Sequence, residues 1–195
     1  MYKKVNITEN HLRILALFAN GFDREYYIRE VQKILRISPR TAQLILDDLE
    51  KKAVLESKIR GKIKSYKLQK NETARNYLVL AEQYKKITFL EEHPMIKEIV
   101  SKITQYIQGI ACIFGSYVKG NATKESDLDI FIAGDYDPRK IKEISKTYGI
   151  DISIKKYPLK SFQEGIRKDI LVKEVLNSHI VFLNAENLVE EATNG

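Results

Sequence analysis

Residues 115–129 read Gly115-Ser116-Tyr117-Val118-Lys119-Gly120-Asn121-Ala122-Thr123-Lys124-Glu125-Ser126-Asp127-Leu128-Asp129, and they join two short apolar segments, 110–114 and 130–133. Apolar runs of this length are typical of buried strands. Successive side chains of a strand point to opposite faces, so Asp127 and Asp129 are expected on one face and Leu128 on the other. The stretch therefore predicts a Gly-Ser turn after one strand and two converging carboxylates at the start of the next.

A third carboxylate follows the same alternation further along the chain. Isoleucines at alternate positions of 150–154 enclose Asp151, which predicts a neighbouring strand that presents Asp151 to the face of the aspartate pair. Three hard oxygen ligands suit Mg²⁺, which completes its octahedral shell with water and substrate phosphates, and they do not suit zinc. A pair of such ions, about 3.5–4 Å apart, clamps the attacking and leaving oxygens of a phosphoryl or nucleotidyl transfer. Asp127, Asp129 and Asp151 are therefore candidate Mg²⁺ ligands.

The Gly-Ser turn supplies groups that suit a phosphate. Gly115 allows a close approach to the backbone, the amides of the following turn can point at phosphate oxygens, and the Ser116 hydroxyl adds a donor. Lys119 places a mobile cation nearby. The sequence lacks the GxxxxGK[ST] pattern of a Walker loop, which argues against an ordinary P-loop ATPase.

The Gly-Ser pair, ten intervening residues and the Asp-x-Asp pair together resemble the DNA polymerase β-like nucleotidyltransferase superfamily, in particular its minimal members. The resemblance covers roughly residues 94–192. It implies that Asp127 and Asp129 bind metal ions and that Asp151 is the third carboxylate, which helps to activate an acceptor hydroxyl. The implied cofactors are Mg²⁺, as two ions, and a nucleoside triphosphate substrate, with ATP expected.

The same resemblance implies a triphosphate site at the turn. Gly115 and Ser116 would hold the triphosphate, and Lys119 stands where many relatives carry a basic residue. Tyr117 departs from the arginine that is common at its position, which puts one triphosphate contact in question.

Residues 8–69 carry the signals of three helices followed by a β-hairpin. Apolar residues recur every three or four positions after Thr8, a candidate N-cap, and again in a second short helix. Ser38-Pro39 is a strong start signal for a third helix, because proline at the first helical position follows an N-cap serine. Residues 54–59 and 62–68 flank Arg60-Gly61 and predict two strands joined by a tight turn.

This order of elements resembles the winged helix-turn-helix family of DNA-binding domains. The resemblance implies that the third helix enters the major groove of double-stranded DNA, where arginine reaches guanine and glutamine reaches adenine. The base-reading candidates at the N-terminal end of that helix are Arg40, Thr41 and Gln43. The basic hairpin, or wing, is expected to contact phosphates. Its candidate residues are Lys58, Arg60, Lys62 and Lys64.

Two features of the same region favour an alternative without DNA. The lysines of the hairpin also fit an ordinary solvated face, and the helical unit would then serve protein contacts only. Asp47, Asp48 and Glu50 place negative charge on the later turns of the third helix, which would repel DNA if those turns lay deep in the groove.

The charge of the chain is divided unevenly. The 195 residues carry a formal net charge of +7. Residues 1–90 contain 19 Lys and Arg against 10 Asp and Glu, whereas residues 91–195 contain 14 against 16. A basic excess favours polyanionic partners such as nucleic acid, so DNA binding is expected of the first half.

Cysteine usage and hydropathy restrict the class of protein further. Cys112 is the only cysteine, which excludes an internal disulfide and a multi-cysteine metal site and fits a reducing compartment. No apolar run approaches the roughly 18 residues that span a bilayer, and the polar N-terminus does not resemble a signal peptide. We therefore expect a cytoplasmic protein without a membrane partner.

Residues 73–92 contain no Gly or Pro and place Tyr77, Leu80, Tyr84 and Ile87 along one side of a predicted long helix. This apolar seam either pairs two copies of the chain as a homodimer or packs on the chain's own domains, and both interpretations remain open.

The expected fold class is α+β in two domains. Because proline disfavours helix at the residue before it, His93-Pro94 marks the candidate boundary. The organisation predicted is a winged helix-turn-helix domain over 1–70, a connecting helix over 71–93, and a minimal nucleotidyltransferase domain with a mixed β-sheet and flanking helices over 94–195.

Two functions fit this organisation. The first is an Mg²⁺-dependent enzyme that transfers NMP from an NTP to a hydroxyl of a partner protein or an RNA end. Minimal members of the resembled superfamily often act as antitoxins that adenylylate a small helical HEPN toxin, which implies such a partner and an autoregulatory use of DNA binding. The second is a DNA-binding transcriptional regulator whose transferase-like domain is catalytically silent and senses a nucleotide or a partner.

Overall fold

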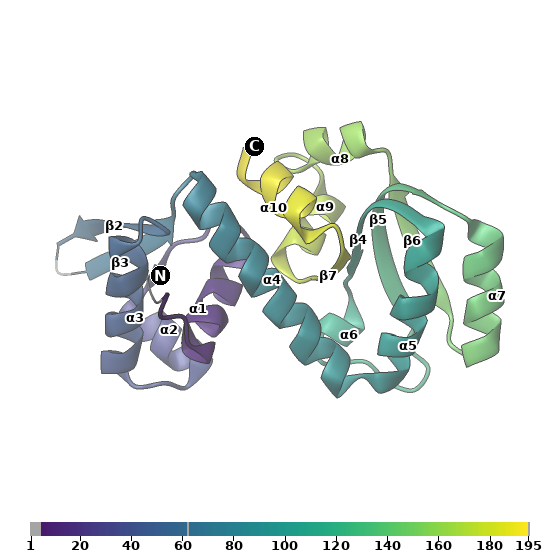
Figure 1. Ribbon diagram of the computed structural model, residues 1–195, viewed down its shortest axis with the longest axis horizontal. Coiled ribbons are helices and arrows are strands. Elements are labelled where there is room, and N and C mark those ends of the chain that lie inside the picture. Colours follow the sequence, from purple (N-terminus) through teal and green to yellow (C-terminus); the bar gives the residue numbers. More distant parts are fainter. Residues whose placement is uncertain (1–4, 62, 195) are drawn as a thin grey trace. The chain divides into compact units, whose positions relative to one another are not determined.

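The computed structural model of the chain describes residues 5–61 and 63–194. The fold class is α+β, as expected, and the chain divides into two compact units, residues 1–81 and 82–195. The elements of each unit are labelled in Figure 1. Within the described residues, no helix combines the length and the apolar composition that a membrane crossing requires.

The first unit contains helices and one small antiparallel sheet. Its elements are α1 (Glu9–Ala19), β1 (Tyr26–Tyr27), α2 (Ile28–Leu35), α3 (Pro39–Lys51), β2 (Leu55–Arg60) and β3 (Ile63–Leu68). The Ser38 side chain accepts the Thr41 N–H at the start of α3, which confirms the Ser-Pro start signal. The predicted hairpin is also present, and the strand β1, which the sequence analysis did not predict, pairs with β3.

Helix α4 (Glu72–Glu92) belongs to both units, because the division falls between Ala81 and Glu82. That division lies well before His93-Pro94, where the sequence analysis placed the boundary. The expected apolar seam is not the buried side of the helix. Leu80 and Ile87 are about half exposed, at 46% and 56%, whereas the residues buried on α4 include Ala74, Leu78 and Ala81. Pairing of two copies through the seam stays a prediction.

The second unit is built on a four-stranded sheet. Its elements are α5 (Pro94–Ile103), the 3₁₀ turn η1 (Thr104–Tyr106), β4 (Ile107–Ile113), α6 (Ser116–Lys119), β5 (Leu128–Tyr136), α7 (Pro138–Tyr148), β6 (Ile152–Tyr157), α8 (Leu159–Gly165), α9 (Ile170–Asn177), β7 (Ile180–Leu183) and α10 (Ala185–Asn194). The strand order is β6-β5-β4-β7, with β5 parallel to β6 and the other pairs antiparallel. The predicted mixed sheet is therefore confirmed.

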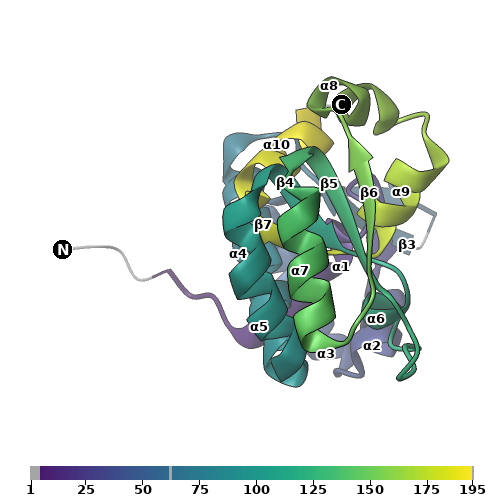
Figure 2. The ribbon, with the colours of Figure 1, turned by 90° about the vertical axis from the view of Figure 1, so that its right-hand side faces the viewer.

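Helices cover both faces of this sheet, as Figure 2 shows. On one face, Leu128, Ile130 and Ile132 join a buried core with apolar residues of α5 and α7. On the other face, the Phe131 ring lies 5.7 Å from that of Phe162 on α8. The alternation along β5 thus directs its aliphatic residues into one core, and Asp129 and Phe131 to the opposite face.

A buried cluster of charged residues, Glu82, Lys85 and His179, connects the second half of α4 to the rest of its unit. Glu82 and His179 are fully buried, and the Glu82 Oε1 atom lies 3.0 Å from the Lys85 Nζ and 3.1 Å from the His179 Nε2. The Oε2 atom has no hydrogen-bond partner in the described part of the chain. Burial by itself would raise the pKa of Glu82, but the charges of Lys85 and His179 outweigh it and lower that pKa.

We predict that Glu82→Gln lowers the free energy of unfolding by about 3–5 kcal/mol, because it removes one partner of a buried ion pair. A carboxylate with a lowered folded-state pKa contributes stability above its ordinary pKa of 4.5, and this contribution is lost as the pH falls through the folded-state value. The wild type should therefore lose stability on acidification below this range, and the variant should lack that component. Urea unfolding followed by circular dichroism at several pH values measures both effects.

Glu91→Gln is the matched control, since Glu91 is an exposed glutamate on the same helix. Equal unfolding curves for the two variants would show that the buried cluster contributes no stability.

Candidate active site

The Gly-Ser turn joins β4 to α6 and is held against β5. Phe114 donates its backbone N–H to the Asp129 carbonyl oxygen at 3.0 Å. Gly115 follows with φ = 75° and ψ = −146°, a conformation that residues with a side chain rarely adopt. Helix α6 then begins at Ser116. The predicted turn is thus present, and its backbone leads directly from the sheet into the first amides of a helix.

The carboxylate of Asp129 lies against the backbone of this turn. A Cβ atom at position 115 would stand 2.3 Å from the Asp129 Oδ2 atom and 3.1 Å from its Cγ. The first distance is shorter than nonbonded atoms tolerate, so a side chain at this position would displace the Asp129 carboxylate from where it lies. Gly115 is therefore favoured both by its backbone conformation and by the position of Asp129.

The other two predicted carboxylates stand at the starts of adjacent parallel strands. Leu128 donates its N–H to the Asp151 carbonyl oxygen at 2.7 Å, and Leu128 pairs with Ile152 in the ladder. Leu128 and Ile152 belong to the core side of the sheet, so the preceding residues Asp127 and Asp151 lie toward the opposite side, with Asp129. Asp127 and Asp151 are exposed, and Asp129 is half-buried.

The three carboxylates share a face, but their side chains do not converge on one point. Among residues 5–61 and 63–194, no group of three or more His, Cys, Asp and Glu side chains is placed to hold a metal ion. Protein-bound Mg²⁺ is commonly held by one or two carboxylates together with water and substrate phosphates. The hard oxygen atoms of Asp127 and Asp129 therefore fit Mg²⁺ as a minimal donor set, and Asp151 would have to turn toward them to join it.

Lys119, the predicted cation of the site, is already paired. Its Nζ lies 2.7 Å from the Glu174 Oε1 atom on α9, and both side chains are about half exposed. Glu174 was not among the predicted site residues. It is 55 positions away in the chain, and its place in α9 carries no local signal that links it to α6. A triphosphate at the turn would compete with Glu174 for this ammonium group.

The loop between α6 and β5 is closed by its own hydrogen bonds. The Thr123 N–H donates to the Ser126 Oγ at 2.8 Å, and the Ser126 N–H donates to the Thr123 carbonyl oxygen at 3.1 Å. The Tyr117 hydroxyl contacts the Ser126 carbonyl oxygen at 3.5 Å. Tyr117, which stands at the position where an arginine was expected, thus contacts the loop that leads into Asp127.

The predicted base-reading residues lie at the start of α3 in the first unit. Arg40 is exposed, whereas Thr41 and Gln43 are half-buried. The Thr41 hydroxyl lies 2.8 Å from the Ser38 hydroxyl, so it takes part in capping the helix. Arg40 and Gln43 are thus differently accessible, and their role in DNA recognition stays a prediction.

The predicted wing residues divide between the two faces of the hairpin. In the β2–β3 ladder Arg60 pairs with Ile63 and Ile59 pairs with Lys64, so Lys58 and Arg60 share one face and Lys64 lies on the other. Lys58 and Arg60 are exposed. Lys62 lies outside the described residues.

Lys64 contacts the acidic side of α3. Its Nζ lies 2.7 Å from the Glu50 Oε2, 3.1 Å from the Asp47 Oδ1 and 4.7 Å from the centre of the Tyr66 ring. Burial alone would lower the pKa of Lys64, but the contacts with Glu50, Tyr66 and Asp47 outweigh it and raise that pKa. Lys52 likewise pairs with Asp48. The three acids that argued against DNA binding are thus paired with two lysines of the same unit, which offsets part of their charge and occupies one predicted wing cation.

Comparisons with known proteins agree with the geometry of the second unit. The family model described as "Nucleotidyltransferase domain" matches residues 93–188. A relative from Methanocaldococcus jannaschii, named as a candidate protein adenylyltransferase, is 41% identical over 51 residues, which cover 25% of this chain and 51% of the relative. The match therefore spans about half of the relative's length. No solved structure gives a significant match.

Residues 93–188 therefore form a nucleotidyltransferase domain, the class of enzyme domain that transfers a nucleoside monophosphate. The match begins at His93, the residue that the sequence analysis placed at the boundary, although the compact unit begins earlier, at Glu82. The match supports a transferase activity for this domain.

We predict that Gly115→Ala weakens MgATP binding about tenfold or more, because Asp129 must move away from the new methyl group and the backbone is strained. Gly120→Ala is the matched control. Gly120 also has a positive φ, 71°, but a Cβ atom there meets nothing within 4 Å. Isothermal titration of both variants with MgATP measures the difference, and equal losses of affinity would show that the Asp129 contact has no part in binding.

Proposed function

We propose that the protein transfers a nucleoside monophosphate, with ATP as the donor, to a hydroxyl group of a partner protein. The observation that carries this proposal is the packing of the Asp129 carboxylate against the Gly-Ser turn, within a domain that matches the nucleotidyltransferase family model. In this proposal, the backbone that binds the phosphates and the carboxylate that binds the metal ion are therefore neighbours.

The residues have distinct roles in the proposed reaction. The amides that follow Gly115 and the Ser116 hydroxyl bind the triphosphate, and Lys119 exchanges Glu174 for a phosphate oxygen. The acceptor oxygen bonds to the α-phosphorus while the bond to the bridging oxygen of the leaving pyrophosphate breaks. Asp151 accepts the proton of the acceptor hydroxyl.

In this proposal, Asp127 and Asp129 would hold one or both of the two expected Mg²⁺ ions. When bound, Mg²⁺ neutralises phosphate charge and stabilises the attacking and leaving oxygens. The exposure of Asp127 and Asp151 leaves both carboxylates accessible to a substrate complex that arrives with its metal.

A protein acceptor is favoured by the relative from Methanocaldococcus jannaschii, whose name assigns it to protein adenylyltransferases. The superfamily resemblance suggests a more specific form of this proposal, in which the acceptor is a small helical partner of the HEPN type and this chain is its antitoxin. RNA is the less favoured acceptor, because residues 91–195 carry more acidic than basic residues.

We predict that Asp127→Asn and Asp129→Asn each reduce the rate of label transfer at least about a hundredfold, because metal-assisted charge stabilisation is worth several kcal/mol. The assay incubates the full chain with α-labelled ATP, Mg²⁺ and candidate partner proteins. Asp135→Asn is the control, since Asp135 is an exposed aspartate at the far end of the same strand, paired with Lys156.

The same assay tests the second candidate function, a silent regulator. Nucleotide binding by the wild type without transfer to any partner would favour the regulator and would contradict the proposed enzyme.

We further propose that the first unit is a winged helix-turn-helix domain that binds double-stranded DNA. Its order of helices and strands supports this, with α3 preceded by the short helix α2 and followed by the β2–β3 hairpin. Lys58 and Arg60 are exposed on the same face of the hairpin, which supports phosphate contact, and Arg40 is exposed at the start of α3, which supports base contact.

For this DNA proposal, we predict that replacing Lys58 and Arg60 together with Ala weakens binding and lowers the salt dependence, the slope of log K against log salt, by about two. Lys64→Ala should change the slope little, because its ammonium group is paired with Asp47 and Glu50. Fluorescence anisotropy with a short random-sequence duplex at several salt concentrations measures the slopes. A loss of slope from Lys64→Ala as large as the loss per residue in the double variant would contradict the division of the hairpin into two faces.

A further inference from the structure

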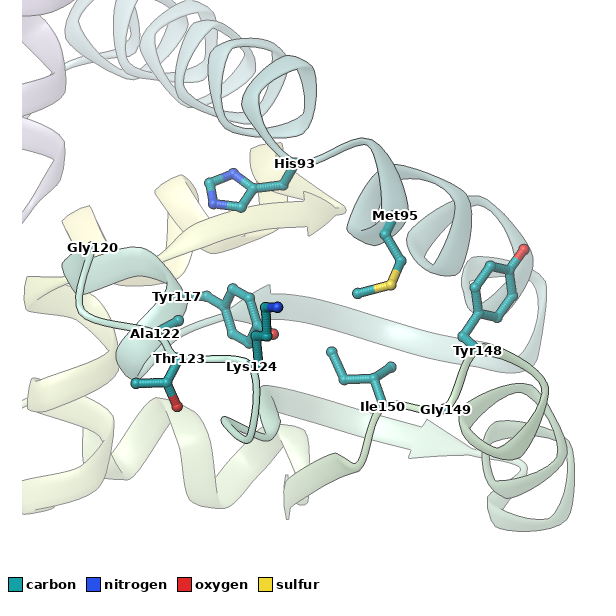
Figure 3. A pocket seen from close by; sticks show the side chains of 10 residues that line it. All are labelled: His93, Met95, Tyr117, Gly120, Ala122, Thr123, Lys124, Tyr148, Gly149 and Ile150. Atoms are coloured by element: carbon teal, nitrogen blue, oxygen red, sulfur yellow. The ribbon is translucent and has the colours of Figure 1, made fainter.

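A pocket of about 650 Å³ lies beside the candidate active site, within the second unit. His93, Met95, Tyr117, Lys124, Tyr148 and Ile150 supply its side-chain walls, as Figure 3 shows. The pocket falls within the range of about 300–1,000 Å³ that ligand sites occupy. None of the residues given a role in nucleotide or metal binding lines it.

Two of its walls continue directly into the candidate catalytic residues. The loop from Gly120 to Lys124 forms one wall and leads into Asp127. Gly149 and Ile150 form another wall and immediately precede Asp151. The pocket therefore lies at the end of the sheet where β5 and β6 begin, which is the end that carries Asp127 and Asp151.

The pocket combines apolar surface with one cation. The His93 ring is stacked on Phe89, with ring centres 4.3 Å apart, and it lies nearly perpendicular to the Tyr117 ring, with ring centres 6.3 Å apart. Met95 is 46% exposed, so an apolar contact is available to a ligand. The ammonium group of Lys124 has no ion-pair partner in the part of the chain that the structure describes.

We infer that this pocket binds the polypeptide segment that carries the acceptor hydroxyl, by taking an apolar side chain next to that hydroxyl and an acidic side chain onto Lys124. This inference rests on the proposed function and names the substrate class of the same site. The bulky apolar side chain would pack between Met95 and Ile150, and the neighbouring residue with the hydroxyl would extend toward the start of β6, which Asp151 precedes.

The chemistry of the walls favours a polypeptide over RNA. Sites for single-stranded RNA combine a cationic groove along the backbone with stacking surfaces, whereas Lys124 is the only lysine or arginine lining this pocket among the described residues. A peptide with one carboxylate and one apolar side chain matches both the single cation and the apolar walls.

The test uses the full chain and two fluorescein-labelled peptides with a central Leu-Tyr pair, flanked by aspartates in one and by lysines in the other. The wild type should bind the aspartate peptide about three- to fivefold more tightly, as expected for one exposed ion pair. Lys124→Glu should reverse this preference, and Met95→Gln should weaken the binding of both peptides. Lys142→Glu, an exposed lysine of α7 outside the pocket, should keep the wild-type preference.

Three results would overturn the inference. The first two are binding that does not depend on the sign of the peptide charge and a preference that Lys124→Glu leaves unchanged. The third is displacement of the aspartate peptide by a short oligoribonucleotide or by MgATP that binds in the same pocket. The transfer assay separates this inference from the proposed function. Label transfer without the charge preference would contradict only the inference about the peptide pocket. Peptide binding with no label transfer to any protein would contradict the proposed enzyme activity.

Discussion

The contact between Gly115 and the carboxylate of Asp129 is the constraint on which the second unit depends. It requires β4 and β5 to be adjacent and antiparallel, since the Phe114 N–H must also reach the Asp129 carbonyl oxygen. It leaves no room for a Cβ atom at position 115 unless Asp129 moves, and glycine adopts the backbone conformation there at little cost. The pairing of β4 with β5 and the position of the Asp129 carboxylate beside the turn are therefore linked.

The parallel pairing of β5 with β6 adds the third carboxylate to the same face. Parallel neighbours need a crossover, and α7 supplies it. Because Leu128 and Ile152 occupy the core side, the burial of aliphatic side chains by itself directs Asp127 and Asp151 away from the core. A slip of one residue in either strand would bury a carboxylate, so the hydrophobic pattern fixes the geometry of the site.

Much of this arrangement could be predicted from the sequence, because it depends on local sequence patterns. The Gly-Ser turn, the Asp-x-Asp alternation and the Ser38 cap each depend on residues a few positions apart. The pairing of Lys119 with Glu174 and of Lys64 with Asp47 could not be predicted, since those contacts exist only after distant elements pack. The two-residue strand β1 was too short to leave a periodic pattern.

The buried side of α4 could not be predicted from the sequence for a related reason. A helix of 21 residues that belongs to two units need not bury one continuous stripe, because each unit offers its own packing surface. Ala74 and Leu78 are buried in the first part, and Phe89 and Leu90 join the core in the second, while Glu82 is held by its buried ion pairs.

The charge count of the first half also has to be corrected for contacts between distant elements. Lys64 and Lys52 neutralise acids of α3, so the cations left for a polyanionic partner are fewer than the sequence total, and α3 is less acidic toward DNA than its residues suggest.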